Sequence, residues 1–344
     1  MAVTTMKSKV TPGSGLTLTK RQARLAMIML APTFFVLILI AFYPLARTFT
    51  SSFTDEPFAR PEVAINNVGL ANYERLFGVQ LAPFPEGTRL RDVINPGFQR
   101  VSTFELFGTR YLLAASDPMW LQSIINTVLF TIISVALELL IGLAVALVVN
   151  TQFRGRGVMR AVMLIPWAIP TAISTVLWRY MLNDNTTGAL NAVLSALGII
   201  DPANSIAWRS QYPLLSVIIV DVWKTVPFMA LLLLAGLQTI SHDLYEAAAV
   251  DGASVSQRFL RITLPLLMPT ILIALIFRTL DALRVFDVFY ILLPQTTRSM
   301  ATHNYEMMVS SYQYGYASAI GVLIFIIIFA FTILYMSLLR VEVD

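Results

Sequence analysis

The residues best suited to chemistry in this chain are ionisable side chains that lie within or beside long apolar runs. They are Glu138, Asp221, Lys224, Arg278, Asp281, Arg284 and Asp287. An ionised group in hydrocarbon costs about 2.5–3.5 kcal/mol on insertion scales, so such residues face a bundle interior or a water-filled cavity. From Arg278 to Asp287 the charges recur every three residues, which places them on one helical face. The chemistry open to the set is mutual charge pairing that holds helices together, or hydrogen bonding to a polar solute.

Several other kinds of site are excluded by residue counts and motifs. The chain has no cysteine and two histidines, His242 and His303, so it cannot build a cysteine- or histidine-rich metal site. It contains no G-x-x-x-x-G-K-[ST] segment, the phosphate cradle of an ATPase. No nucleophile is accompanied by a base, and no basic patch carries interleaved aromatic residues. The sequence therefore predicts no catalytic residue, no metal ligand and no nucleic-acid partner.

The elements that must position the charges are transmembrane helices. Of the 344 residues, 57% are hydrophobic and 13% charged, against about 25% charged in soluble domains. A spanning helix needs about 20 mainly apolar residues. Six such runs occur: Leu25–Leu45, Trp120–Val149, Val158–Leu182, Pro213–Leu237, Leu264–Leu293 and Ala317–Leu339. The sequence predicts an all-α, polytopic membrane protein with six transmembrane helices.

Basic residues in short loops predict the orientation of these spans. The residues that fall on one side when the spans alternate are Lys20, Arg21, Arg24, Arg154, Arg156, Arg160, Arg258, Arg261 and Arg340. Short loops rich in lysine and arginine face the cytoplasm. We therefore expect both termini to be cytoplasmic.

The same pattern divides the chain into four regions. Residues 1–24 are expected to be a disordered cytoplasmic tail, 25–47 the first transmembrane helix, 48–118 an extracytoplasmic segment, and 119–340 the transmembrane core. A signal peptide is the competing interpretation of a basic start before an apolar run. The first run is too long for one and ends without a small-residue cleavage site.

Prolines predict irregular backbone in two places. The extracytoplasmic segment contains six of them, and we expect short helices there only near Asn72–Phe77 and Thr103–Ala115. Pro166 and Pro170 in the third span, and Pro227 in the fourth, should kink those helices or free carbonyls to face a cavity. The alternative is that they reflect only the higher frequency of proline in membrane helices.

A polar, alanine-rich segment at about 241–265 lies between the fourth and fifth spans. Asp243 with Glu246 predicts a capping box that starts a helix at Leu244, and Ser254 with Gln257 predicts a second. Gly252 between them can adopt left-handed dihedrals without steric cost. Two short helices with a small-residue surface suit close approach by a partner protein, whereas a plain connector needs neither cap.

The order of residues in this segment resembles a known family. Glu246-Ala247-Ala248-Ala249-Val250-Asp251-Gly252-Ala253, followed by Ile262-Thr263-Leu264-Pro265, is similar to the EAA loop of binding-protein-dependent ABC importer permeases. The resemblance implies that a cytoplasmic ATPase docks on this loop. The residues it implies for coupling are Glu246, Ala247, Ala248, Asp251, Gly252 and Ala253.

Four further segments resemble permeases of the maltose and trehalose type, in the family of the larger maltose permease subunit. They are Asn67–Tyr73 (G-L-x-N-Y), Asn126–Thr131 (N-T-x-x-F/Y-T), Asp221–Met229 and Phe277–Asp287. The resemblance implies the type I importer fold in a bacterial or archaeal cytoplasmic membrane. It also implies a second permease subunit, two cytoplasmic ATP-binding subunits and an extracytoplasmic sugar-binding protein. ATP and Mg belong to those ATPase subunits, and this chain holds no cofactor.

The resemblance also implies where a sugar would bind. The positions that match are Asp221, Thr225 and Phe228 in the fourth span and the stretch Arg278–Ala282 in the fifth. With Lys224 and Asp281, these residues are expected to form two facing walls of a polar cavity, and Glu138 to serve as a structural or gating pair. The chain departs from the family between Gly78 and Asp117, where it has an outer insertion, and after Tyr290, where a Gly-Gly-Pro turn is absent.

Two other functions remain open on the residues alone. One is a membrane-embedded enzyme acting on lipid-linked sugar, with Asp221, Asp281 and Asp287 as acids. The other is an ion-coupled secondary transporter whose buried acids carry protons, which would require internal inverted repeats.

Overall fold

The computed structural model describes residues 15–201, 203–293 and 297–338. Within these residues five helices are long and apolar enough to cross a membrane: Gln22–Ser51, Pro118–Asn150, Pro213–Leu237, Val255–Ala282 and Tyr314–Ser337. A sixth span results if Arg156–Ala168 and Thr171–Met181, bent by 89° from each other, are taken as one. The predicted helical, multi-span architecture is confirmed, and its third span is broken into two parts.

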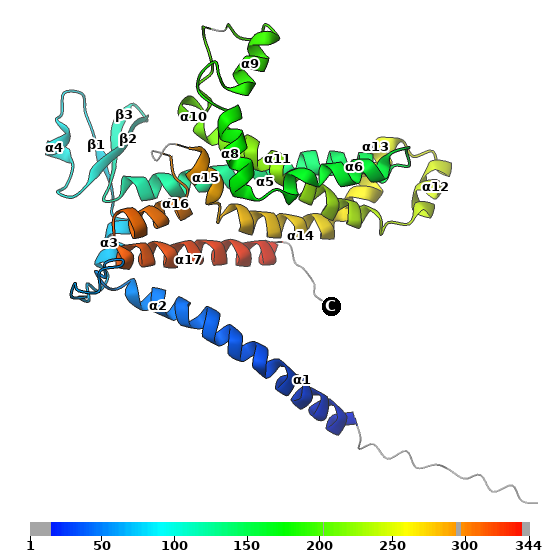
Figure 1. Cartoon of the computed structure of the whole chain (residues 1–344), viewed down its shortest axis with the longest axis horizontal. Coiled ribbons are helices and arrows are strands. Elements are labelled where there is room, and N and C mark those ends of the chain that lie inside the picture. The colour runs from blue at the N-terminus through cyan, green and yellow to red at the C-terminus, as the bar shows by residue number, and fades with distance from the viewer. Residues whose placement is uncertain (1–14, 202, 294–296, 339–344) are drawn as a thin grey trace, which may run out of the picture.

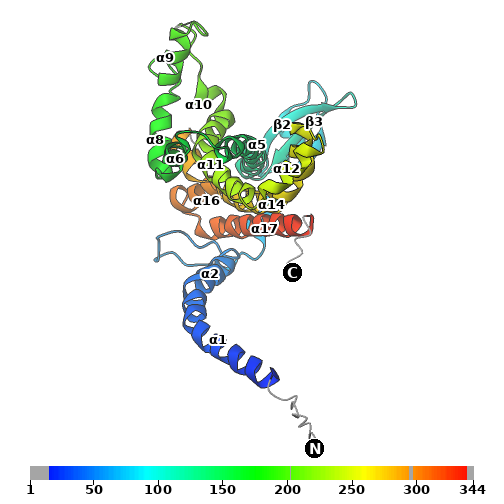
Figure 2. The same cartoon turned by 90° about the vertical axis from the view of Figure 1, so that its right-hand side faces the viewer.

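The first span stands apart from the rest of the chain. Helix α1 (Gly15–Leu37) continues through a π-helical turn into α2 (Tyr43–Ser51). Both views show α1 leaning away from the bundle, with α2 alone approaching α17 (Figures 1 and 2). The first 14 residues of the predicted tail lie outside the described residues, and 15–24 are helical, so the helix begins earlier than expected.

Two long helices form the centre of the bundle. Helix α5 (Pro118–Asn150) and α11 (Pro213–Leu237) pack along each other, with α14 (Leu264–Ala282) against both. Helices α5 and α11 approach each other closely at Gly142, where an added Cβ would lie 2.7 Å from Cγ of Met229. Buried Leu233, Leu234 and Leu267 continue this core toward the end that carries the alanine-rich loop.

The third span breaks where its prolines predict. It comprises α6 (Arg156–Met163), α7 (Ile165–Ala168) and α8 (Thr171–Met181). Proline cannot donate a backbone hydrogen bond and its ring clashes with the preceding turn, and α8 starts directly after Pro170. The expected kink is present as the 89° bend. Pro227, by contrast, lies inside an uninterrupted α11.

The fifth apolar run is also divided. After α13 (Val255–Arg258) and a π-helical turn, α14 ends at Ala282, and α15 (Asp287–Leu292) returns to pack against α8 and α11. The predicted single span Leu264–Leu293 is therefore two helices with a turn between them. The chain then forms α16 (Met300–Tyr305), a further π-helical turn and α17 (Tyr314–Leu338).

The outer insertion carries a small antiparallel sheet. After α3 (Ala71–Phe77), strands β1 (Val79–Pro83), β2 (Gln99–Leu106) and β3 (Thr109–Ala115) pair in the order β1-β3-β2, with α4 (Leu90–Val93) between β1 and β2 (Figure 1). The helix predicted near Asn72–Phe77 is confirmed.

The helix predicted over Thr103–Ala115 is wrong, because this stretch is the β2–β3 hairpin. Phe107 and Gly108 form its turn with φ of 49° and 74°. Two consecutive positive φ values are typical of the tight turns that match the twist of paired strands.

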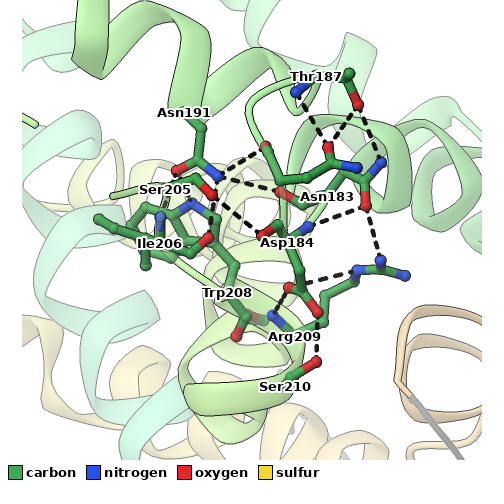
Figure 3. Close-up of polar contacts among 11 residues, drawn as sticks. Asn183, Asp184, Thr187, Asn191, Ser205, Ile206, Trp208, Arg209 and Ser210 are labelled. Carbon is green, nitrogen blue, oxygen red and sulfur yellow. Dashed lines mark hydrogen bonds and ion pairs between the residues drawn. The ribbon is translucent and has the colours of Figure 1, made fainter. Parts of the chain in front are cut away.

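A polar loop follows the third span. It spans residues 183–201 and 203–210 and includes α9 (Ala189–Ala196) and the start of α10 (Trp208–Gln211). The buried amide of Asn191 donates to the carbonyls of Asn183, Asn185 and Ile206 at 3.0–3.2 Å. Its oxygen accepts the indole N–H of Trp208 at 3.0 Å (Figure 3). One side chain thus fixes both limbs of the loop.

Candidate functional site

A single guanidinium forms the centre of the candidate site. Arg278 on α14 donates Nη2 to Oε1 of Glu138 at 2.9 Å and Nη1 to Oδ2 of Asp281 at 2.8 Å. Its Nε also donates to Glu138, and its Nη2 to Asp221 on α11. The planar five-donor fork of arginine suits such multiple carboxylate contacts. The fifth span is therefore bonded to the second and the fourth through one residue.

Burial divides these carboxylates into two kinds. The side chain of Glu138 is fully buried and that of Asp221 nearly so, whereas Asp281 is 66% exposed. Removing one partner of a buried ion pair leaves an uncompensated charge, which is strongly destabilising. Glu138 and Asp221 therefore hold helices together, and Asp281 keeps free acceptor capacity at the surface of the network.

A cavity of about 180 Å³ opens beside this network. It is lined by Thr171, Asp221, Lys224, Thr225, Arg278, Asp281, Ala282, Arg284, Val285, Phe286, Asp287 and Val288. All the predicted sugar-site residues except Phe228 are thus brought to one cavity. The expected arrangement in two separate walls differs from the structure, because Asp221 and Arg278 are bonded directly rather than separated by open space.

Lys224 points toward the broken third span. Its Nζ donates to the carbonyl of Ile169 at 2.6 Å and lies 3.4 Å from that of Trp167. These carbonyls lack helical backbone N–H partners because the helix is interrupted at Pro170. The ammonium of Lys224 therefore donates the hydrogen bonds that backbone N–H groups would have donated. The freed carbonyls foreseen for this span are present, and Lys224 binds them at the edge of the cavity.

Phe228 lies outside the cavity lining. Its ring stacks on Trp167 with centroids 5.9 Å apart and planes 12° apart. The aromatic side chain that the structure does place in the cavity is Phe286, from the turn before α15.

The alanine-rich loop forms two helices at the end of the bundle that lies away from the β-sheet (Figure 1). Helix α12 (His242–Val250) is followed by Gly252 at φ +78° and then by α13 (Figure 1). The capping box of Ser254 and Gln257 is present as predicted. The first cap differs, since Ser241 and not Asp243 precedes the helix and accepts from the N–H of Asp243.

The residues predicted for coupling lie on α12 and in the turn that follows it. Glu246, Ala247, Asp251 and Gly252 are exposed, and Ala248 and Ala253 are half-buried. Tyr245 anchors the helix by a 3.0 Å hydroxyl contact with Thr263. Around the turn, Val250 is 88% and Val255 73% exposed, so apolar side chains surround the small residues.

The part of the chain that the structure describes contains no group of three or more histidine, cysteine, aspartate or glutamate residues arranged to hold a metal ion.

Comparison with known families decides the class. The family described as binding-protein-dependent transport system inner membrane component matches residues 138–340. The chain belongs to this family. It is a permease subunit and a multi-pass inner-membrane protein. Such permeases are themselves non-catalytic, and the ATPase lies in separate subunits.

Curated relatives of this permease extend the match to nearly the whole chain. The trehalose/maltose transport system permease protein MalF of Thermococcus litoralis is 38% identical over 94% of this chain and 96% of its own length. The sulfoquinovosyl glycerol transport system permease protein SmoG of Agrobacterium fabrum is 34% identical over 92% of this chain and 91% of its own length. The trehalose transport system permease protein SugA of Mycobacterium tuberculosis is 37% identical over 61% of this chain and 66% of its own length.

Solved structures show that the permease has an importer fold. A bacterial ABC transporter involved in import of the acidic polysaccharide alginate superposes with a TM-score of 0.70 at 21% identity, over 96% of this chain and 99% of that one. A bacterial alginate ABC transporter in complex with an alginate pentasaccharide-bound periplasmic protein superposes with a TM-score of 0.68 at 21% identity, over 92% of this chain and 95% of that one.

The motif residues of this permease act mainly as bonds between segments. In the G-L-x-N-Y stretch, Asn72 donates to the carbonyls of Ser52 and Thr54, both at 2.9 Å, and ties α3 to the first span. In the N-T stretch, Thr127 accepts from the N–H of Met300 at 2.9 Å. Sequence reasoning did not foresee Asn191 or Thr171. Asn191 follows a run of turn residues, Asn183–Gly188, and this is the signal that could have identified it.

Proposed function

We propose that this permease carries a neutral sugar, a disaccharide such as trehalose or maltose, inward across the membrane through the cavity at Asp221 and Arg278. Relatives at 38% and 37% identity are named for trehalose or maltose transport. The observation that carries the proposal is the absence of a net positive charge among the described residues at the cavity. Three carboxylates, Asp221, Asp281 and Asp287, and three cations, Lys224, Arg278 and Arg284, line it. Glu138, bonded to Arg278, adds a fourth carboxylate behind the lining.

This distribution disfavours an acidic solute and suits an uncharged, hydroxyl-rich one. The paired ions keep spare donor and acceptor capacity for hydroxyl groups but offer no net positive charge to attract an anion. The aromatic ring of Phe286 provides an apolar face for the C–H side of a sugar ring. A few polar groups in a mainly apolar site are typical of small-molecule recognition.

The cavity is only part of a complete site. Its volume of about 180 Å³ falls short of the roughly 300–1,000 Å³ of typical ligand pockets. A second permease subunit would supply the remaining wall. A binding protein would deliver the sugar at the outer face, and two ATPase subunits, which hold ATP and Mg, would dock on the alanine-rich loop.

Uptake by the reconstituted importer tests the proposal. The complete complex is placed in proteoliposomes with its binding protein, and uptake of radiolabelled trehalose and maltose is measured with and without internal ATP. We expect ATP-dependent uptake of at least one of them, and none of a uronic-acid disaccharide of similar size. Uptake of the charged sugar with rejection of both neutral ones would overturn the proposal.

A further inference from the structure

We propose that Phe286, Tyr290 and Tyr305 form a second sugar-binding surface, an aromatic platform that holds one pyranose ring next to the ring in the cavity. The proposal rests on the proposed sugar transport and adds a site to it.

The three rings hold one another in a fixed arrangement. Phe286 and Tyr290 stack with centroids 5.2 Å apart and planes 15° apart. Tyr305 packs edge-on against both, with centroids 5.3 Å away from each. Aromatic pairs in stacked and edge-on arrangements stabilise each other beyond the area they bury. The rings are therefore positioned before any ligand arrives.

The platform adjoins the cavity. Phe286 lines the cavity and also stacks on Tyr290, so the two sites share one side chain. Tyr290 is 51% exposed and lies on the side of α15 away from the buried Val288, Phe289 and Leu292. One face of the stack therefore remains open to a ligand.

The charges around it show that this side faces water or a polar surface and not lipid. Asp281, Arg284 and Asp287 are exposed and line the cavity together with Phe286, which stacks on Tyr290. Exposed charges are costly against hydrocarbon. The exposed tyrosine thus adjoins a charged cavity and not an apolar, lipid-facing surface.

Polar groups beside the rings complete the features of a carbohydrate site. Arg298 donates to Glu306 at 2.5 Å, and both line a hollow of about 40 Å³ together with Tyr290 and Tyr305. The hollow is large enough for a water molecule or a hydroxyl group but not for a sugar ring. A ring stacked on Tyr290 would direct a hydroxyl toward this ion pair.

The test compares variants of the complete importer, purified with its second permease and ATPase subunits but without binding protein. Equilibrium binding of radiolabelled maltose and trehalose is measured for Tyr290→Ala and Tyr290→Phe. Tyr180→Ala is the matched control, since Tyr180 on α8 is also exposed (72%) and takes no part in the ring contacts of the platform. We expect Tyr290→Ala to weaken disaccharide binding about three- to tenfold, and the other two variants to bind like the unmodified complex.

Two results would overturn the platform while leaving sugar transport intact. One is unchanged binding by Tyr290→Ala. The other is a Tyr290→Ala complex that assembles poorly but binds sugar normally once assembled, which would mean that the ring packs against the second permease. If the unmodified complex binds neither disaccharide but binds a non-sugar solute, the proposed function fails and the platform fails with it.

Discussion

Arg278 and Glu138 face each other with two donors against two acceptors, Nε and Nη2 of the guanidinium donating to the two carboxylate oxygens. The residues are 140 positions apart and lie on α14 and α5. The contact fixes the position and rotation of one helix against the other, because a two-point contact permits little rotation of either side chain. Removal of Arg278 would leave the buried carboxylate of Glu138 without this partner, whereas removal of Glu138 leaves Arg278 paired with Asp221 and Asp281.

The partners of this guanidinium should therefore differ in what they contribute. We expect Glu138→Ala to destabilise the complex by about 1.5–3 kcal/mol, because it removes buried hydrogen bonds to a charged group. Asp281→Ala should cost less than about 1 kcal/mol, because Asp281 is largely exposed, yet weaken sugar binding. Thermal unfolding of the purified complex and equilibrium sugar binding measure the two effects. Equal destabilisation by both variants would show that exposure does not separate their roles.

The contact between α5 and α11 at Gly142 should not tolerate a methyl group. An added Cβ would lie 2.7 Å from Cγ and 3.0 Å from Cβ of Met229. We expect Gly142→Ala to lower stability by about 1–3 kcal/mol through overpacking. Gly157→Ala on α6 is the control, since a Cβ there meets nothing within 4 Å. The unfolding midpoints of the two variants should differ, with only the first below that of the unmodified complex.

Gly252 should matter for coupling and not for sugar binding. Its φ of +78° is inaccessible to proline, whose ring fixes φ near −65°. Gly252→Pro is expected to abolish sugar-stimulated ATP hydrolysis while sugar binding persists. Asparagine tolerates left-handed dihedrals, so Gly252→Asn should retain most of the stimulation. Full stimulation in the proline variant would remove this turn from the coupling surface.

Asp117 should support stability in a defined pH range. Burial alone raises the pKa of its carboxyl, but hydrogen bonds from His303 and Tyr316, with the charge of His303, hold that pKa well below its ordinary 3.8. Because the folded pKa is depressed, the stabilisation is fully present above the unfolded value and is lost as pH falls below about 4. We expect Asp117→Asn to lower the unfolding midpoint at pH 7 and to flatten its decline between pH 5 and pH 3. A parallel decline in both proteins would exclude Asp117 as its source.

Fusion reporters test the orientation of the spans. A reporter active only outside the cytoplasm should score positive near Glu86 or Ala203, in the outer insertion and the outer polar loop. It should score negative near Arg156, near Gln257 and after Asp344. The reason is that the short loops near Arg156 and Gln257 are rich in arginine, which is typical of cytoplasmic loops. A positive score at Gln257 would place the alanine-rich loop where no ATPase reaches it.

The positions of the long helices could be predicted from the apolar runs, but only some of the breaks within these helices could be. Proline marked the bend at Pro170, because the loss of a backbone donor is a local property. The turn after Ala282 was missed, since the run Leu264–Leu293 continues in composition while the backbone reverses. Packing of Val288, Phe289 and Leu292 against α8 and α11 decides that reversal, and one sequence does not reveal it.

The outer hairpin illustrates the opposite failure. Alternation of large and polar residues over Gln99–Leu106, followed by Phe107-Gly108, was available as a strand signal. The strand conformation is supported by pairing of β3 with β1 as well as with β2, and the residues of Thr103–Ala115 do not reveal that pairing.

The candidate site was partly predictable for a physical reason. Charges in a membrane must converge on partners or water, so Asp221, Lys224, Arg278 and Asp281 could be grouped from their types alone. Which of them pair could not be foreseen, because periodicity gives the face of each helix but not its rotation against the next. Glu138 was expected in a structural or gating pair, and it contacts Arg278.

The isolation of the first span bears on how the protein is made. The most apolar 18-residue stretch of Gln22–Ser51 has a mean hydropathy of 2.7, and none of it is buried against the described part of the chain. A helix of this kind enters the bilayer on its own hydrophobicity as it leaves the ribosome, without waiting for the later spans to be synthesised. Its depth is then set by the match between its apolar length and the membrane thickness. An unrelated apolar helix of the same length, exchanged for residues 22–42, should leave the fold of residues 118–338 intact.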